Sequence, residues 1–156
     1  MNLDQALAYV MQLCIRFEGI YLKPYLCPAG IPTIGCGSTR YLDGTPVTLF
    51  DKPITREHAM VLLRERVIRE FMPGVMALCK CSTAEQLAAL TDFAYNLGLG
   101  NLRASTLRRR ANAGRWDLVV IELRKWVRGG GKVLPGLVKR RAVEGSLING
   151  TLVQSG

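Results

Sequence analysis

The sequence predicts an α+β fold, with a small β-hairpin lobe, a larger and mostly helical lobe, and a cleft between them. Three observations support this prediction. Residues 2–18 carry an apolar stripe at helical spacing. Residues 20–50 are rich in Gly and Pro between short runs that favour strands, and helical patterns return at Thr55 and continue to the end of the chain.

The first helix is predicted from its apolar spacing. Apolar side chains recur every three or four residues and therefore share one helix face: Leu3, Ala6, Val10, Leu13, Cys14 and Phe17. Gly19 favours the end of this helix, because glycine readily adopts the backbone conformations that stop one. We therefore expect a helix over residues 2–18, with Glu18 as its last residue.

The next segment has the composition of a small, irregular sheet. Residues 20–50 contain four glycines and four prolines, spread along the segment: Gly30, Gly35, Gly37, Gly44, Pro24, Pro28, Pro32 and Pro46. The pair Asp43-Gly44 is typical of a hairpin turn. Short strands joined by tight turns are therefore expected here.

A long helix is expected to follow this sheet. Thr55 is a favourable N-cap, because its hydroxyl can accept a hydrogen bond from a backbone N–H group of the first turn. The helix should reach about residue 70, where Pro73-Gly74 interrupts it, since proline lacks the N–H group that a helix interior needs. His58, in the first turn, is expected to be exposed.

The remaining chain is expected to be helical in shorter pieces. Ser82 or Thr83 with Gln86 favours a helix start, and Gly98 and Gly100 favour its end. Further helices are predicted at three places: 103–113, 115–127 and 135–148. We also expect a flexible break at Gly129–Gly131, and Trp116 and Trp126 as core residues of one helix.

Composition indicates a globular chain without a membrane span. The 156 residues are 49% hydrophobic and 21% charged, which suits one folded domain over residues 1–156. We expect the sheet lobe at about 20–55 and the helical lobe at about 56–150 together with the first helix. No run of about 18 apolar residues is present, and the N-terminus lacks the basic region of a secretory signal. We therefore expect the protein to be made and retained in the cytoplasm.

The net charge of +9 comes from the last third of the chain. Residues 1–101 hold nine Lys or Arg and nine Asp or Glu, whereas residues 102–156 hold twelve and three. A basic region of this kind suits an anionic polymer, such as nucleic acid, an acidic membrane surface or a cell wall. The simpler interpretation is that the charge only keeps the protein soluble.

The five cysteines do not predict a disulfide framework or a metal site. Their number is odd and no secretory signal accompanies them. Cys79 and Cys81 are separated by one residue, which is closer than the usual spacing of zinc ligands, and His58 is the only histidine. We expect no metal and no cofactor.

Glu18 is the first candidate for a chemical role. It ends a helix, where the negative end of the helix dipole disfavours a second negative charge, and it lies at the edge of the apolar stripe. Both effects favour a protonated carboxylic acid, which a glycosidase needs to protonate a leaving oxygen. Position alone does not decide this, because a Glu at a helix end is most often a solvated surface group.

The segment after Glu18 carries a resemblance to a known family. The stretch Tyr25-Leu-Cys-Pro-Ala-Gly-Ile-Pro-Thr-Ile-Gly-Cys-Gly37 resembles the active-site hairpin of bacteriophage lysozymes, family 24 of the glycoside hydrolases. In that family a helix ends in Glu-Gly, an Asp or Cys follows after nine residues, and a Thr follows after fifteen. Glu18, Cys27 and Thr33 stand at these spacings. The resemblance extends from about residue 10 to 148, through Phe93–Gly100 and the run from Gly130 to Arg141.

This resemblance implies a lysozyme-like fold, with no separate wall-binding domain, and an endolysin that hydrolyses the β-1,4 bond between N-acetylmuramic acid and N-acetylglucosamine in peptidoglycan. Glu18 would act as general acid, while Thr33 and Cys27 would position the attacking water, with inversion at the sugar carbon. Cys27 is a poorer substitute for the Asp that can occupy this position, because a free thiol is mostly neutral at pH 7 whereas a carboxylate is charged. It is therefore either partly ionised or only a packing residue, as Cys36 is expected to be.

Four further residues are candidates for binding the substrate. Tyr95 and Asn96 offer a ring and an amide that suit sugar rings and hydroxyls, although both could equally serve the core. Ser105 and Thr106 are expected to cap a helix, with sugar contact as a second role. The resemblance also implies that Arg140 or Arg141 pairs with Glu18, without deciding which.

Two other functions stay open on the sequence. The basic, partly apolar C-terminal third also fits a protein that permeabilises membranes or binds anionic polymers without catalysis. A lytic transglycosylase would use one Glu but no water, and Thr33 at the water-holding position favours hydrolysis. No nucleic-acid-binding motif is present. We expect a monomer that a holin-type membrane lesion releases to the periplasmic cell wall.

Overall fold

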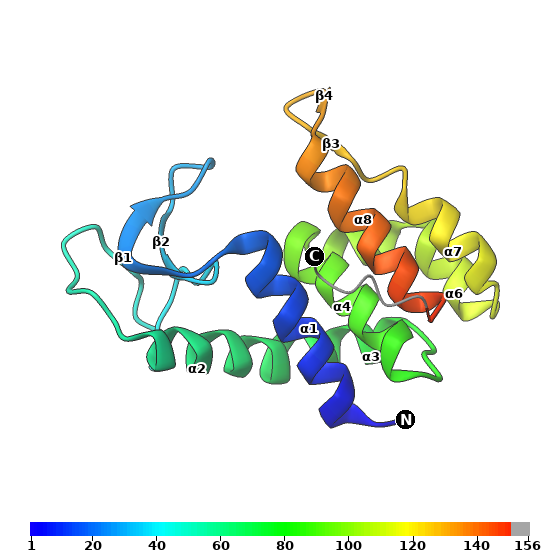
Figure 1. Cartoon of the computed structure of the whole chain (residues 1–156), viewed down its shortest axis with the longest axis horizontal. Helices are drawn as coiled ribbons and strands as arrows, with labels where there is room; N and C mark the ends of the chain where they lie inside the picture. Colours follow the sequence, from blue (N-terminus) through cyan, green and yellow to red (C-terminus); the bar gives the residue numbers. More distant parts are fainter. Residues whose placement is uncertain (151–156) are drawn as a thin grey trace.

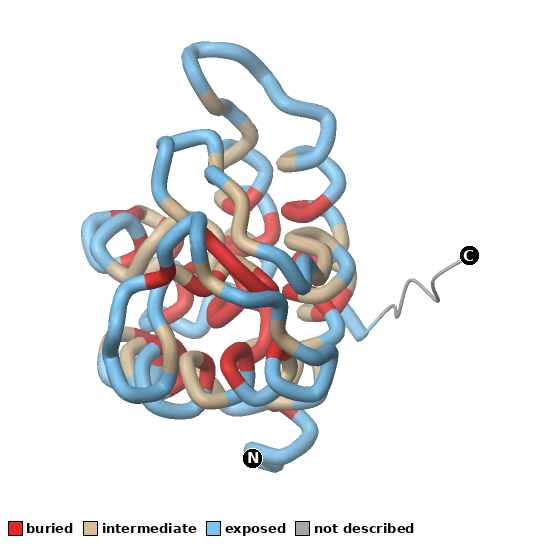
Figure 2. Tube along the Cα trace, turned by 90° about the vertical axis from the view of Figure 1, so that its left-hand side faces the viewer, coloured by how far each residue is buried: buried red, intermediate tan, exposed pale blue. Residues whose placement is uncertain are grey.

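The computed structural model describes residues 1–150 and confirms the expected α+β fold. A two-stranded sheet lies at one end of the molecule, and the helix α2 (Arg56–Arg66) runs from it towards the other helices (Figure 1). The sheet consists of β1 (Tyr21–Leu26) and β2 (Pro32–Gly35). Figure 2 shows that the buried residues gather inside the molecule, while the turns beside the sheet are exposed.

Helix α1 (Leu3–Glu18) has the bounds that its apolar stripe predicts. The Asn2 side chain caps it by accepting a hydrogen bond from the Gln5 backbone N–H group. Ala6, Val10 and Cys14 are fully buried on its inner face. Gly19 ends the helix with φ of 75°, a conformation that favours glycine, so Glu18 stands on the last turn.

The hairpin β1–β2 is antiparallel and irregular. Tyr25 pairs with Thr33 and Leu26 with Pro32, and the register shifts between Tyr21 and Tyr25. Asp43-Gly44 forms the expected turn, in which Gly44 has φ of 86° and the Gly44 N–H group bonds to the Tyr41 carbonyl. Ile34, Val47 and Leu62 form a small separate core that joins the sheet to α2.

The helical run after Thr55 corrects one prediction. Thr55 caps α2 through the His58 N–H group, and His58 is exposed, as expected. The interruption, however, is a π-helical turn, η1 (Val67–Phe71), and helix α3 (Met72–Leu78) runs through Pro73-Gly74. Pro73 lies in the first turn of α3, where the missing N–H group costs little.

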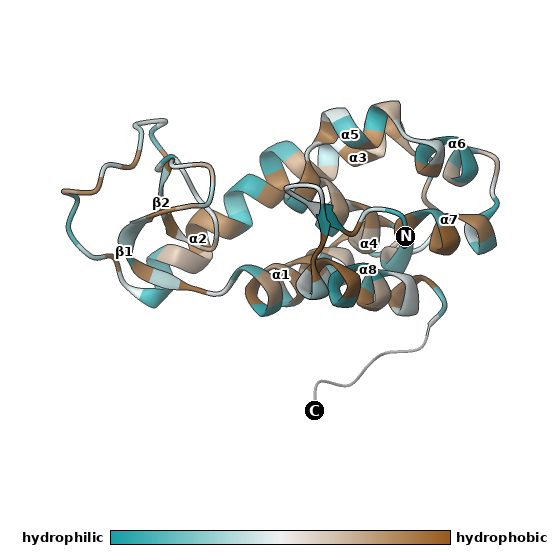
Figure 3. Cartoon of the chain, turned by 90° about the horizontal axis from the view of Figure 1, so that it is seen from above, coloured by the Kyte–Doolittle hydropathy of each residue, from teal (hydrophilic) through white to brown (hydrophobic). Residues whose placement is uncertain are grey.

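Helix α4 (Ala84–Leu97) is central to the larger part of the fold. Thr83 and Gln86 form the reciprocal cap that the sequence suggested, and Gly98 ends the helix. In Figure 3, α4 is largely apolar and lies between α1 and α8 on one side and α3 and α5 on the other, and it contacts all four. Its burial accounts for the long apolar run in the sequence.

The segment after Gly98 forms two helices where one was expected. Helix α5 (Leu99–Ala104) includes Gly100, so Gly100 does not end α4. Helix α6 (Thr106–Asn112) begins after Ser105, whose hydroxyl accepts a hydrogen bond from the Arg108 N–H group. The prediction of a single helix over 103–113 was wrong because the Ser105 cap breaks it.

The last elements correct two expectations and confirm a third. Helix α7 (Trp116–Leu123) ends before Trp126, so the two tryptophans are not on one helix, although both pack against the core. Gly130 and Gly131, with φ of 59° and 78°, form the tight turn of a hairpin between β3 (Arg128–Gly129) and β4 (Lys132–Val133), where we expected a flexible break. Helix α8 (Pro135–Ile148) lies as predicted.

Across residues 1–150, every helix is too short or too polar to cross a lipid bilayer.

Candidate active site

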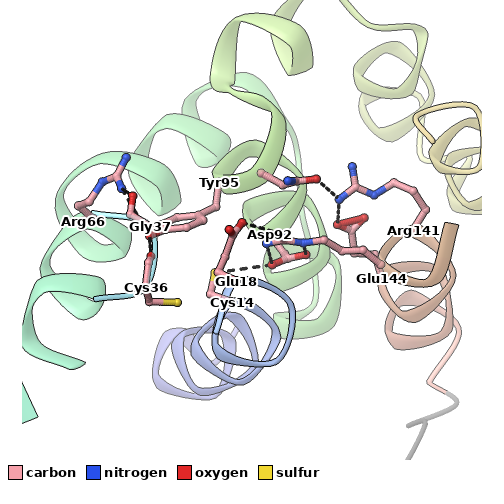
Figure 4. Close-up of polar contacts among 11 residues, drawn as sticks. Cys14, Glu18, Cys36, Gly37, Arg66, Asp92, Tyr95, Arg141 and Glu144 are labelled. Atoms are coloured by element: carbon pink, nitrogen blue, oxygen red, sulfur yellow. Dashed lines mark hydrogen bonds and ion pairs between the residues drawn. The ribbon is translucent and has the colours of Figure 1, made fainter. Parts of the chain in front are cut away.

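Glu18 lies at the edge of a buried charge network (Figure 4). Arg140, on α8, donates one hydrogen bond to Glu18 at 2.7 Å and two to Asp92, on α4, at 2.8 and 2.9 Å. Arg140 and Asp92 are buried, whereas the Glu18 side chain keeps 27% of its surface exposed. Glu18 is therefore held through Oε1 while its side chain stays partly exposed. Arg140, and not Arg141, is the arginine that pairs with it.

A second buried pair adjoins this network. Arg141 donates from Nη2 to Glu144 at 2.8 Å and to the amide oxygen of Asn96 at 2.9 Å. Burial, and then the nearby negative charge of Asp92, raise the pKa of Glu144 well above its usual value.

The hairpin brings together two of the predicted catalytic residues. Thr33 is only 2% exposed, and its hydroxyl donates to the Ile31 carbonyl at 2.8 Å. Cys27 begins the turn between β1 and β2, and its N–H group donates to the same carbonyl at 3.0 Å. Backbone hydrogen bonding from Ile31, and then from Ala29, lowers the pKa of the Cys27 thiol. Cys27 is therefore more ionised at neutral pH than an ordinary cysteine.

This difference predicts selective alkylation of Cys27. Burial raises the pKa of Cys36 and Cys81 to about 12 and that of Cys79 to about 11, and it also raises the pKa of Cys14. Iodoacetamide at pH 7.5 should therefore label Cys27 first, because the thiolate is the reactive form. Peptide mass spectrometry between pH 6 and 9 measures the five rates, and equal labelling of all five thiols would contradict the prediction.

A glycine loop brings the hairpin next to Glu18. Gly37 has φ of 78°, and a Cβ atom added there would lie 3.5 Å from Tyr95 Oη and 3.9 Å from Glu18 Oε2. Only glycine fits this position without strain. The loop that follows Thr33 therefore lies close to the candidate general acid.

The predicted substrate-binding residues lie in two places. Tyr95 and Asn96 end α4 beside the charge network, where the Tyr95 hydroxyl donates to the Cys36 carbonyl and Asn96 accepts from Arg141. Ser105 and Thr106 lie at the α5–α6 junction. The Ser105 hydroxyl caps α6, and the Thr106 hydroxyl accepts from Arg109 at 2.9 Å. Sugar contact by these four residues stays a prediction.

Three residues of the site were absent from the sequence-based candidates. Asp92 is an acid within the apolar run of α4, and Glu144 follows Arg141 by three residues on α8, so each interrupts a buried helix face. Charged residues at such positions are rare unless they are paired, and this signal could have identified both. Arg66, at the end of α2, donates to the Gly37 carbonyl at 2.8 Å and carries no comparable signal.

No metal site accompanies these residues. Within residues 1–150, no group of three or more His, Cys, Asp or Glu side chains is placed to hold a metal ion. All five cysteines are free thiols.

Comparison with known proteins places this geometry in a family. The profile of the family described as "Phage lysozyme" matches residues 15–144, a span that contains Glu18, Cys27, Thr33 and the charge network. The chain belongs to the phage lysozyme family. The resemblance read from the hairpin motif is thereby confirmed.

Individual relatives agree with this assignment. The chain is 41% identical over 153 residues to an endolysin of Bacillus phage B103, covering 94% of this chain and 54% of the relative. An endolysin from Escherichia coli O157:H7 phage FAHEc1 is 31% identical and superposes with a TM-score of 0.83 over 99% of this chain and 98% of that one. The muramidase domain of SpmX from Asticaccaulis excentricus is 28% identical, with a TM-score of 0.75 over 89% and 93%.

The lengths of these relatives differ. The chain spans about half the length of the Bacillus phage endolysins that it matches and nearly the whole of the FAHEc1 endolysin.

Proposed function

We propose that this member of the phage lysozyme family is an endolysin-type muramidase, which hydrolyses the β-1,4 bond between N-acetylmuramic acid and N-acetylglucosamine in peptidoglycan. The observation that carries the proposal is Glu18, held at the end of α1 by Arg140 while the loop beyond Thr33 lies against it. Muramidase and endolysin relatives support the same activity.

Glu18 supplies the proton in this mechanism. One side of its carboxyl group is fixed by Arg140, so the exposed side can face the glycosidic oxygen of a bound glycan. Arg140 also donates two hydrogen bonds to Asp92, so its positive charge is shared between two carboxyl groups. Proton transfer to the leaving oxygen then proceeds as positive charge develops on the sugar ring.

The hairpin residues position the water. The Thr33 hydroxyl and the Cys27 backbone N–H group share the Ile31 carbonyl as a hydrogen-bond acceptor, so Thr33 is held close to the backbone of Cys27. The lowered pKa of Cys27 increases the thiolate fraction of this side chain, and a thiolate can accept a proton from the attacking water. Attack from the face opposite Glu18 inverts the sugar carbon.

The surface charge of the C-terminal third suits an anionic polymer. Arg140 and Arg141 are buried and paired with acids, so they add nothing to this surface. The exposed basic residues remain: Arg103, Arg109, Arg110, Arg115, Arg124, Lys125, Arg128, Lys132 and Lys139. We propose that they hold the enzyme near anionic wall or outer-membrane polymers.

We also propose that the enzyme is a monomer. It would be made in the host cytoplasm, be released by a holin, and act on the periplasmic cell wall.

Analysis of the released fragments tests the activity. Outer-membrane-permeabilised Gram-negative cells are treated with the protein, and the soluble products are examined by mass spectrometry. Fragments that end in reducing N-acetylmuramic acid are expected. Anhydro ends would identify a lytic transglycosylase instead, and clearing without glycan fragments would indicate action on membranes by the basic surface.

A further inference from the structure

Two side chains of the helices hold consecutive carbonyl groups of the loop after β2. Arg66, the last residue of α2, donates from Nη1 to the Gly37 carbonyl at 2.8 Å. Tyr95, near the end of α4, donates from its hydroxyl to the Cys36 carbonyl. Figure 4 shows both side chains converging on this loop from two different helices. The loop is therefore fastened at two adjacent points.

Arg66 and Tyr95 also hold each other. Arg66 Nη1 lies 3.4 Å from Tyr95 Oη, and the guanidinium carbon lies 5.1 Å from the centre of the Tyr95 ring. Phe71, in the π-helical turn, packs against both, at 5.4 Å from the guanidinium and 5.1 Å between ring centres. Contacts with aromatic rings limit the freedom of the guanidinium, so its N–H group keeps a fixed direction.

Because the loop directly follows β2, holding the loop in place also restricts the position of Thr33. The turn through Gly35, Cys36 and Gly37 is closed by two hydrogen bonds between Ile34 and Ser38, at 2.8 and 2.9 Å. Thr33 directly precedes Ile34 and is buried. On the other side, a Cβ atom added at Gly37 would lie 3.9 Å from Glu18 Oε2, so Gly37 is close to Glu18. The same short loop therefore lies beside Glu18 and continues into the strand that carries Thr33.

We propose that Arg66 and Tyr95 form a clamp that sets the position of Thr33 relative to Glu18, and that both are positioning residues for glycoside cleavage; this proposal rests on the proposed function. Neither side chain needs to touch the reacting atoms. A small displacement between the acid and the water-holding hydroxyl lowers the rate of a reaction that requires both, because catalysis depends on their alignment with the substrate.

Kinetics on soluble peptidoglycan glycan strands test the clamp. Tyr95→Phe removes the bond to the Cys36 carbonyl and keeps the ring, and Arg66→Met removes the bond to the Gly37 carbonyl. Each substitution also removes the bond between Arg66 and Tyr95. Each should lower kcat about tenfold and leave KM within about twofold. Arg66→Lys should restore part of the lost rate, since an ammonium group can still donate to one carbonyl. The matched control is Arg64→Met, which removes the same charge from an exposed side chain two residues away.

A double-mutant cycle separates positioning from general stability. If the clamp acts through Thr33, Arg66→Met should lower kcat less than twofold in a Thr33→Ala background, because the group that it positions is already gone. Thermal unfolding of each variant must lie above the assay temperature. The full tenfold loss in the Thr33→Ala background would show a general structural effect and overturn the proposal.

Two other outcomes would also overturn the clamp. One is wild-type kcat in both Tyr95→Phe and Arg66→Met. The other is a raised KM with unchanged kcat in Tyr95→Phe, which would make the hydroxyl a sugar-binding group. If the wild-type protein releases no reducing glycan ends, the proposed function fails and the clamp fails with it, so the two failures are distinguishable.

Discussion

Glu18→Gln is expected to lower the rate of glycan release by about 10³-fold or more, because glutamine has no proton to give to the leaving oxygen. The substitution keeps the shape of the side chain and an oxygen that can accept the hydrogen bond from Arg140. Arg140 also keeps both bonds to Asp92. The free energy of unfolding should therefore change by less than about 1.5 kcal/mol.

Two measurements check this expectation together. Release of reducing ends from purified peptidoglycan gives the rate, and urea unfolding at pH 7 gives the stability. Glu57→Gln is the matched control, since Glu57 is an exposed glutamate in the first turn of α2 and its variant should retain full activity. A Glu18→Gln variant that still releases reducing ends at the wild-type rate would remove Glu18 from the mechanism.

Helix ends and caps were the features that the sequence predicted best. Thr and Gly signals are local, so Gly19, Thr55 and a helix start at Ser82 or Thr83 with Gln86 could be predicted from neighbouring residues alone. The errors came where tertiary contacts override such signals. Pro73 does not stop its helix because a π-helical turn precedes it, and Gly130-Gly131 forms a tight turn rather than a flexible break.

Some residues of the candidate site could likewise be predicted from local sequence, whereas others could not. Glu18, Cys27 and Thr33 lie within sixteen consecutive residues, so their spacing was visible in the sequence. Arg140 and Asp92 are 48 residues apart in the chain and Arg66 and Gly37 are 29 apart, so only the packing of helices on the hairpin brings each pair together. A spacing rule cannot predict such pairs, although an acid on a buried helix face, such as Asp92, indicates that a partner exists.

Asp92→Ala is expected to lower the free energy of unfolding by about 3–5 kcal/mol, because it leaves Arg140 buried without its principal counterion. Asp92 is fully buried and accepts two hydrogen bonds from Arg140 and one from the Cys14 thiol, at 3.6 Å. Only Glu18 would remain to balance the arginine charge. A loss of this size is a large part of the 5–15 kcal/mol that typically stabilises a domain.

Urea unfolding of Asp92→Ala and Asp117→Ala measures the effect against a matched control. Asp117 pairs with Arg115 at 2.9 Å, but both side chains are more than half exposed, at 64% and 57%. Exposed ion pairs contribute about 1 kcal/mol or less, so the control should lose little stability. If Asp92→Ala does not fold, Asp92→Asn keeps one acceptor for Arg140 and should show a smaller loss that still exceeds the control. Equal losses at the two positions would mean that the buried network does not stabilise the fold, and that Arg140 is held near Glu18 by packing rather than by Asp92.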